Sequence, residues 1–294
     1  MKLYDYTNIP NIYIQGDTHG QWGELFFWIK DSYKRKNEST DESTEMFDTF
    51  FGPYKEGNTN YNDSIIIILG DCGLGFEKEK YYHDIFTKCN KILAEHNTHL
   101  LMIRGNHDDP RYYQEELINY SNIKSIPDYS IIQTLKGNML CIGGGISIDR
   151  IWRKQKEAKL NKYKSPKSKN RKQLYWENEL PVINPNLIKD LKDLNTNVDI
   201  ILTHAAPSCA IPFDKEGLNG WFIYDKDLAK DLTMEHQILD DIMLTFIKND
   251  YHIKYWLFGH YHTTYNIKEN NIYFHGFSDT ILPININEIM EIEE

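Results

Sequence analysis

Aspartate, asparagine and histidine recur at one kind of position in this 294-residue sequence, shortly after a short apolar run. Carboxylate, amide and imidazole groups together suit Mn, Fe, Zn, Ni or Co better than Ca or a metal that prefers thiolate ligands. Seven or eight such side chains are too many ligands for one tetrahedral zinc, but they suit two adjacent metals that share a carboxylate. Two such metals can drive the displacement of a phosphoryl group. The residues at these positions are Asp17, His19, Asp71, Asn106, His107, His204, His260 and His262.

Strands and helices must alternate to bring these residues together. Seven apolar or β-branched runs predict strands, and four stretches with apolar residues every three or four positions predict helices. Alternation of this kind indicates a layered α/β fold, in which ligands collect at the carboxyl ends of strands. The expected strands are 11–15, 64–69, 99–103, 138–142, 198–202, 254–258 and 271–274. The expected helices are 22–36, 81–97, 186–194 and 225–249.

Five motifs, in order along the chain, resemble those of the calcineurin-like metallophosphoesterase superfamily. They are Gly16-Asp17-Thr18-His19, Gly70-Asp71-Cys72-Gly73, Gly105-Asn106-His107-Asp108, Thr203-His204 and Gly259-His260-Tyr261-His262. The resemblance spans residues 16–262, and a further segment, Gly144–Arg153 followed by Tyr175-Trp176-Glu177, is similar to bacterial and phage-type members. The resemblance implies a layered α/β/β/α sandwich with its site at the carboxyl ends of the strands. We expect one such domain over residues 1–294.

The same resemblance assigns roles to the motif residues. It implies that Asp17, His19 and His262 hold one divalent transition-metal ion, Mn being the first choice. It implies that Asn106, His204 and His260 hold a second ion, and that Asp71 bridges the two. A hydroxide bridging the metals would attack a phosphomonoester or phosphodiester. His107 would face the substrate, with Asp108 as its neighbour in the catalytic set, and Arg150 and Arg153 are candidate contacts for the substrate phosphate.

The motifs mix features of different branches of the superfamily. The segments Gly16–Gln21 and Leu101–Asp108 resemble the serine/threonine protein phosphatase branch, which continues its second motif as GDxxDRG. Here the chain runs Gly70–Gly75 as GDCGLG, so the Asp and Arg of that motif are absent. A phosphoesterase acting on a small molecule or nucleotide is therefore the leading hypothesis. A protein phosphatase and a non-catalytic binding scaffold on the same fold are the alternatives.

Two segments interrupt the alternation of strands and helices. Residues 37–62 are polar and rich in turn formers, which predicts a surface insertion. Residues 150–172 hold 11 Lys or Arg and the single acid Glu157, whereas the rest of the chain has 22 basic and 42 acidic residues. The basic stretch, within an insertion over 150–180, is interpreted either as a solvated loop or as a substrate lid that attracts phosphate-rich ligands, including single-stranded nucleic acid.

Composition limits the class of protein. A net charge of −10 excludes a chain that coats nucleic acid through overall basicity. Four cysteines without a CxxC pair are typical of a reduced, cytoplasmic protein. The first residues lack the apolar core of a signal peptide, and no apolar run reaches the roughly 20 residues of a membrane span. We therefore expect a cytoplasmic enzyme with no membrane partner.

Overall fold

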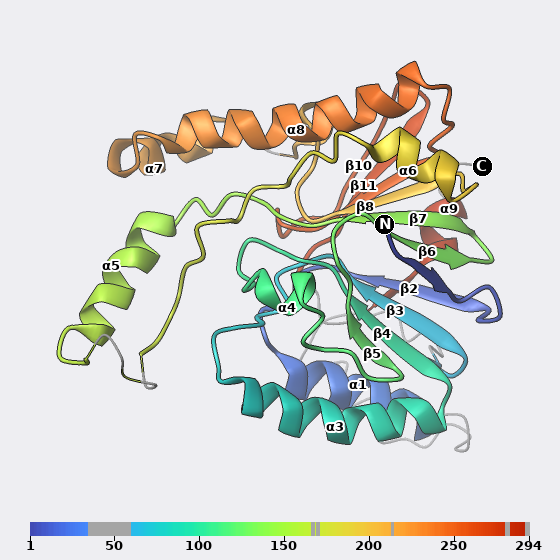
Figure 1. Cartoon of the computed structure of the whole chain (residues 1–294), viewed down its shortest axis with the longest axis horizontal. Helices are drawn as coiled ribbons and strands as arrows, with labels where there is room; N and C mark the ends of the chain where they lie inside the picture. The colour runs from blue at the N-terminus through green and yellow to red at the C-terminus, as the bar shows by residue number, and fades with distance from the viewer. Residues whose placement is uncertain (35–59, 166–167, 169–170, 213–214, 280–282, 292–294) are drawn as a thin grey trace, which may run out of the picture.

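Two β-sheets stack face to face between two layers of helices (Figure 1). The computed structural model describes residues 1–34, 60–165, 168, 171–212, 215–279 and 283–291. Side chains of both sheets meet in a shared apolar layer that includes Ile14, Ile67, Leu202 and Leu257, each 0% exposed. The α/β/β/α sandwich implied by the sequence resemblance is confirmed.

The five-stranded sheet has the order β12-β2-β3-β4-β5. Strands β2 to β5 run parallel, while β12 pairs antiparallel with β2. The outer face is covered by helices α1 and α3 through Trp22 and Phe86 (Figure 1). Burial on both faces explains the unbroken isoleucine run of β3. The bounds are β2 Asn11–Gln15, β3 Ser64–Ile68, β4 Thr98–Met102, β5 Ile123–Ser125, β12 Ile284–Asn285, α1 Trp22–Lys34 and α3 Glu79–Glu95.

The seven-stranded sheet has the order β1-β6-β7-β8-β9-β11-β10. Its central strands β7, β8, β9 and β11 run parallel, so their carboxyl ends share one edge. Helices α6 and α8 cover the outer face through Leu191, Leu239 and Phe246. The bounds are β1 Leu3–Asp5, β6 Ser130–Thr134, β7 Gly137–Ile142, β8 Ile200–Thr203, β9 Tyr255–Phe258, β10 Tyr265–Glu269, β11 Ile272–Gly276, α6 Leu187–Asp193 and α8 Leu228–Lys248.

The basic segment begins with a helix. Helix α5, Arg150–Asn161, projects from the body of the molecule, and the chain returns beside it through residues 171–182 (Figure 1). Of the polar insertion expected over 37–62, residues 37–59 lie outside the described residues. Among the helices described, none combines the length and the apolar character needed to cross a bilayer. The shorter helices are α4 Arg111–Gln114, α7 Asn219–Tyr224 and α9 Ile286–Met290.

Candidate metal centre

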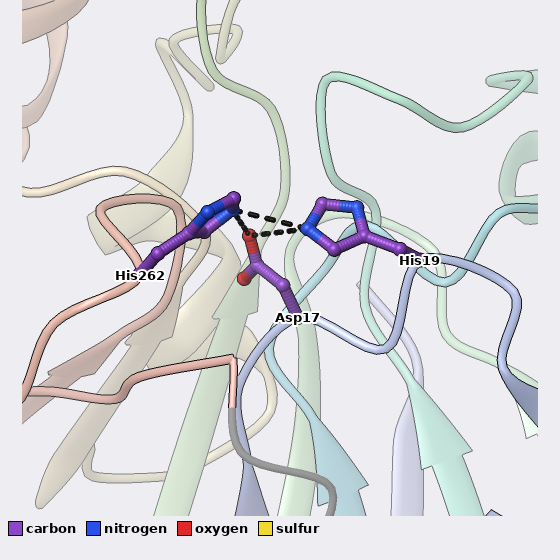
Figure 2. Close-up of side chains that lie close together, drawn as sticks. All are labelled: Asp17, His19 and His262. Carbon is purple, nitrogen blue, oxygen red and sulfur yellow. Dashed lines mark hydrogen bonds and ion pairs between the residues drawn. The ribbon is translucent and has the colours of Figure 1, made fainter. Parts of the chain in front are cut away.

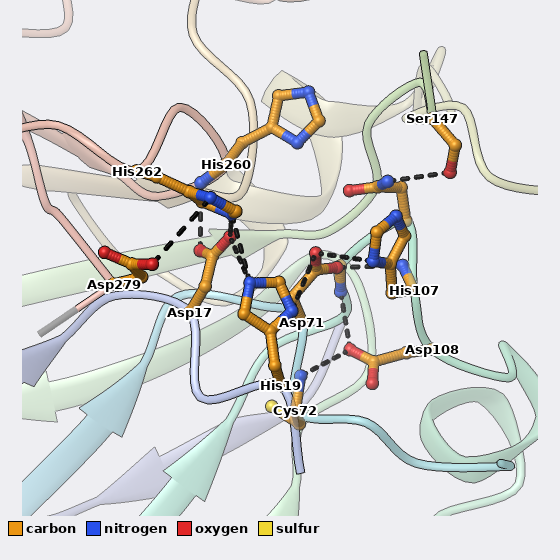
Figure 3. Close-up of polar contacts among 12 residues, drawn as sticks. Asp17, His19, Asp71, Cys72, His107, Asp108, Ser147, His260, His262 and Asp279 are labelled. Carbon is orange, nitrogen blue, oxygen red and sulfur yellow. Dashed lines mark hydrogen bonds and ion pairs between the residues drawn. The ribbon is translucent and has the colours of Figure 1, made fainter. Parts of the chain in front are cut away.

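Side chains from five strand ends converge at one place between the two sheets. The loop after β2 carries Asp17 and His19, and the loop after β3 carries Asp71. The loop after β4 carries Asn106 and His107, and the loops after β8 and β9 carry His204, His260 and His262. Figure 3 shows most of this cluster, with the carboxylates of Asp17 and Asp71 among the imidazoles. The structure thus brings together all eight residues that the strand-end pattern singled out.

One group of donors surrounds the Asp17 carboxylate (Figure 2). His262 Nε2 lies 2.9 Å from Asp17 Oδ2 and 3.0 Å from His19 Nε2, and His19 Nε2 lies 3.8 Å from Asp17 Oδ2. Asp17 Oδ1 accepts a hydrogen bond from the backbone N–H of His260, at 3.0 Å. That bond joins the loops after β2 and β9 and leaves Oδ2 aimed at the two imidazoles.

A second group surrounds His204, which is 0% exposed. His204 Nε2 lies 2.7 Å from Asn106 Oδ1, 3.2 Å from His260 Nδ1 and 3.2 Å from Asp71 Oδ1. The opposite ring nitrogen, Nδ1, donates to the carbonyl oxygen of Leu69 at 2.7 Å, because a carbonyl can only accept. This bond fixes the tautomer that directs an Nε2 lone pair into the group, as in many metal-ligating histidines.

Asp71 connects the two groups. Its Oδ1 faces His204, while its Oδ2 lies 3.9 Å from His19 Nδ1 and 3.4 Å from His107 Nδ1. The Asp71 side chain is 2% exposed, and the backbone N–H of His107 donates to its Oδ1 at 2.8 Å. The carboxylate is therefore placed where a ligand shared by two ions would lie.

The donor spacing fits metal ions. Donors held about 2.1 Å from one ion at tetrahedral to right angles lie about 3.0–3.4 Å from each other. The distances between most donor pairs in both groups fall near this range. Two imidazole nitrogens that both lack a proton form no hydrogen bond with each other, so a shared metal ion accounts better for such a pair. Among the residues that the structure describes, three sets of side chains have ligand atoms within 4.8 Å of one another. They are Asp17, His19 and His262; His19, Asp71 and His107; and Asp17, Asp71 and His204.

The backbone of the ligand loops adopts an uncommon conformation. His19, Asp71, His260 and His262 have φ values of 47°, 49°, 70° and 52°, in the left-handed region that residues other than glycine seldom occupy. Conformations of this kind cost of order 1 kcal/mol or more each and concentrate at functional sites. Four of the seven proposed ligands therefore accept backbone strain that aims their side chains at the centre.

Gly105 allows two ligand loops to touch. A Cβ at this position would lie 2.0 Å from the backbone N of Asp71 and 2.1 Å from its Oδ1. Gly105→Ala should therefore displace Asp71, and we expect less than the wild-type metal content and about a hundredfold loss of turnover, as for an ångström-scale misplacement of a catalytic group. Elemental analysis and a phosphoester assay would measure both.

Gly23→Ala is the matched control for Gly105→Ala. Within the described part of the chain, no atom outside its own helix and neighbours lies within 4 Å of a Cβ at Gly23. Gly23 lies in the first turn of α1, so alanine should leave metal content and turnover unchanged and favour the helix. Wild-type metal content and turnover in Gly105→Ala would show that the loops tolerate separation.

The electrostatics of the site favour a cation. Burial by itself lowers the pKa of His204, but the carboxylates of Asp71 and Asp17 outweigh it and raise that pKa to about 10. For His260, burial and the charge of His204 hold the pKa well below its ordinary value. For His262, the hydrogen bond to Asp17 raises the pKa. The two buried carboxylates thus stabilise positive charge, which a metal ion supplies when it replaces protons.

His107 lies at the mouth of the site between two acidic groups. Its Nδ1 is 3.4 Å from Asp71 Oδ2 and 3.0 Å from Arg153 Nη2, and its Nε2 is 3.9 Å from Asp149 Oδ1. Burial is the main reason that its pKa is lowered, while Asp71 opposes and Arg153 reinforces that effect. Its side chain is 17% exposed, so the ring contacts Asp71 and is still partly open to solvent.

Asp149 is a site residue that the motif analysis missed. Its Oδ1 accepts a hydrogen bond from Arg153 Nε at 2.7 Å, across one turn at the start of α5. The bond orients the guanidinium so that Nη2 reaches His107. An acid four residues before an arginine is the sequence signal of such a pair, but its position beside His107 depends on the fold.

Asp108 supports the ligand loops instead of facing the mouth of the site. Its carboxylate accepts hydrogen bonds from the backbone N–H groups of Cys72, Leu74 and Gly105, at 3.1, 2.9 and 2.9 Å, and from the Tyr113 hydroxyl at 2.9 Å. Burial and the nearby Asp71 raise the pKa of Asp108 to about 6. These contacts clamp the loops after β3 and β4 together, so they favour a supporting role over direct participation with His107.

Arg150 is engaged in the fold. Its side chain is 9% exposed; its Nε lies 2.5 Å from Asp225 Oδ2, and its Nη1 lies 2.6 Å from Asp231 Oδ2 and 4.0 Å from Glu179 Oε1. Asp231 belongs to α8, so the guanidinium joins that helix to the base of α5. These ion pairs favour a structural role for Arg150 over the expected contact with a substrate phosphate, whereas the guanidinium of Arg153 lies beside His107.

Glu179 lies in residues 171–182, the return segment that runs beside α5, and links it to the second group of donors. Its Oε2 accepts from the backbone N–H of Ser147 at 3.2 Å, and the Ser147 hydroxyl accepts from Asn106 Nδ2 at 2.8 Å. Tyr175 donates to Glu179 Oε1 at 3.1 Å. The Glu179 side chain is 2% exposed, and burial raises its pKa to about 7. Three positions that the motif analysis did not assign thus buttress Asn106.

The raised pKa of Glu179 predicts a pH-dependent stability. A carboxyl whose pKa is about 7 when folded and near 4.5 when unfolded destabilises the fold increasingly as pH rises from about 4.5 to 7. Glu179→Gln removes this term, so its melting temperature relative to wild type should rise between pH 5 and pH 8. The gain should be several degrees, on the order of 2–3 kcal/mol. The exposed Glu177→Gln is the matched control, and parallel pH curves for Glu179→Gln and wild type would contradict the prediction.

Comparison with known proteins assigns the family. A family model described as calcineurin-like phosphoesterase matches residues 10–264. The chain therefore belongs to the calcineurin-like phosphoesterase family. Among solved structures, the crystal structure of TT1561 of Thermus thermophilus is similar to it, with 12% sequence identity and a TM-score of 0.43 over 92% of this chain and 90% of that chain. No curated protein matches the chain.

Proposed function

We propose that this protein is a metal-dependent phosphoesterase that hydrolyses a phosphomonoester or phosphodiester bond. The observation that carries the proposal is the convergence of carboxylate, amide and imidazole donors at metal-ligand spacing, in two groups joined by Asp71. When bound, two divalent transition-metal ions, Mn being the first choice, would supply the activated water and neutralise charge on the phosphoryl oxygens. Asp17, His19 and His262 would hold one ion, and Asn106, His204 and His260 the other.

The residues at the mouth would act on the substrate itself. Arg153 would bind the substrate phosphate, because its guanidinium reaches His107 and Asp149 fixes its orientation. His107 would transfer a proton to the leaving alkoxide oxygen or stabilise charge on the phosphoryl group. Since no side chain is placed as the nucleophile in this scheme, we expect no covalent intermediate with the protein.

The test is hydrolysis of two nitrophenyl esters after chelation and reconstitution with Mn²⁺. The phosphomonoester and the bis-diester should be assayed side by side, with bound metal measured in the same samples. We expect turnover of at least one ester that disappears on chelation and returns with metal. Two bound ions with no turnover of either ester would overturn the proposal in favour of a binding scaffold. Turnover of the diester would point to a phosphodiesterase, and turnover of the monoester alone to a phosphatase.

A further inference from the structure

Helix α5 presents aromatic and basic side chains along one exposed side. Trp152, Lys156 and Lys159 of α5, and Tyr163 just beyond its end, follow one another at spacings of four, three and four residues. Residues with this spacing share one side of a helix, and we call them the α5 stripe. We propose that the α5 stripe binds single-stranded nucleic acid and leads it to the metal centre, a proposal about substrate class that rests on the phosphoesterase function proposed above.

The opposite side of α5 is tied to the segment that returns beside it. Glu157 accepts a hydrogen bond from the backbone N–H of Leu174 at 2.9 Å, and Asn161 exchanges two hydrogen bonds with the backbone of Lys172. At the base of the helix, Arg150 is buried among carboxylates. Helix α5 is thus held by the return segment, and Glu157, the one acidic residue of 150–172, points toward that segment. The α5 stripe is left with positive charge and aromatic surface.

The combination of groups in the stripe matches an unpaired polynucleotide. Trp152 is 52% exposed and Tyr163 is 90% exposed, although large aromatic rings usually find apolar cover. Lys156 Nζ lies 4.5 Å from the centre of the Trp152 ring, and Lys162 Nζ lies 5.2 Å from that of Tyr163. Rings that stack on bases, interleaved with cations that contact phosphates, are the features of single-strand binding surfaces. A duplex would hide its bases from these rings.

The charge distribution of the chain and the position of the α5 stripe would both direct a bound nucleic-acid strand to the site. The remainder of the chain has 22 basic and 42 acidic residues, so a polyanion is repelled elsewhere and attracted to this segment. The stripe from position 152 to 163 extends about 16 Å at the rise of an α-helix. It starts next to Arg153, whose Nη2 lies 3.0 Å from His107 Nδ1. A strand bound along α5 would therefore place a phosphate beside His107.

The experiment measures binding of a fluorescent 12-nucleotide oligothymidylate to the full chain in EDTA, where no cleavage occurs, at several salt concentrations. Trp152→Ala/Tyr163→Ala should raise Kd roughly tenfold or more, because each ring stacks on a base. Lys156→Gln/Lys159→Gln should reduce the salt dependence of log K by about 1.4, for two lost phosphate contacts. Phe27→Ala on α1 and Lys230→Gln on α8, both exposed, should bind like wild type. An oligouridylate arm distinguishes RNA from DNA.

Several outcomes would overturn the proposal: wild type that binds no oligonucleotide, folded stripe variants that bind like wild type, or stripe-dependent binding to anionic vesicles in place of oligonucleotides. Circular dichroism melts verify folding, and single lysine variants replace any double variant that fails to fold. Turnover of nitrophenyl esters by wild type separates the two hypotheses. Ester turnover without oligonucleotide binding would leave the phosphoesterase and remove the docking surface. Stripe-dependent binding without turnover of ester or oligonucleotide would leave the docking surface and remove the phosphoesterase function.

Discussion

Replacement of Asp71 by asparagine should abolish turnover and lower the metal content of the protein. The Asp71 carboxylate faces both donor groups, with Oδ1 3.2 Å from His204 Nε2 and Oδ2 3.9 Å from His19 Nδ1. Asparagine keeps the shape but offers one oxygen and no charge to balance the cations. Because a metal pair supplies several kcal/mol of transition-state stabilisation, we expect a loss of roughly a thousandfold or more in kcat.

Asp193→Asn is the matched control for Asp71→Asn, because Asp193 lies exposed at the end of α6. It should leave metal content and turnover at wild-type values. Metal should be counted by elemental analysis of protein dialysed against Mn²⁺, and turnover with the better of the two nitrophenyl esters. If Asp71→Asn kept both metals and wild-type kcat, Asp71 could not be the bridging ligand.

His107→Ala should also lose most of its turnover, but, unlike Asp71→Asn, it should keep its full metal content. His107 lies beside the ligands and contacts Arg153 and Asp71, yet it is not one of the seven residues assigned to the ions. A positioned proton donor or charge stabiliser contributes about 10²–10⁴-fold to the rate, and kcat should fall by that factor. Measurement of kcat, KM and metal content on the same preparations would establish the split.

Exposed His252, on the loop before β9, provides a control of the same residue type. His252→Ala should match wild type in both measurements. Loss of metal from His107→Ala would instead make His107 a ligand, in keeping with its place in the group of His19, Asp71 and His107. Wild-type kcat with intact metals would remove it from the mechanism.

The strands that carry the site could be predicted from local sequence, whereas several others could not. A buried parallel strand needs apolar residues on both faces, so runs such as Ile65–Leu69 are recognisable, and β2 has the predicted bounds. Strand β6 has the sequence SIIQT, and β10 is mostly exposed, so neither stands out by hydrophobicity. For β10 the available signal was the turn, since Asn270 and Asn271 have φ values of 51° and 61°, typical of a tight hairpin.

The proposed metal ligands could be predicted from the sequence more completely than the residues that support them. Each proposed metal ligand lies within four residues of the end of a strand, so local motifs and a layered fold suffice to bring them together. Arg150 illustrates the limit, because its role depends on Asp225, 75 residues away, and Asp231, 81 residues away. Helix α5 was obscured by its lysine content, and its partners on the return segment become apparent only when the two are packed together.

The order of the proposed ligands along the chain bears on when the protein could first bind the proposed metal ions. Asp17 and His262 face each other at 2.9 Å, although 245 positions separate them, and both sheets must form before they meet. During synthesis the amino-terminal sheet could assemble strands β2 to β5 while the last ligand motif is still untranslated. A complete site would thus exist only after the chain has been translated past His262. Metal occupancy would then report that the parallel strands of the second sheet had been added correctly, so it could serve as a check on the assembly of the two sheets.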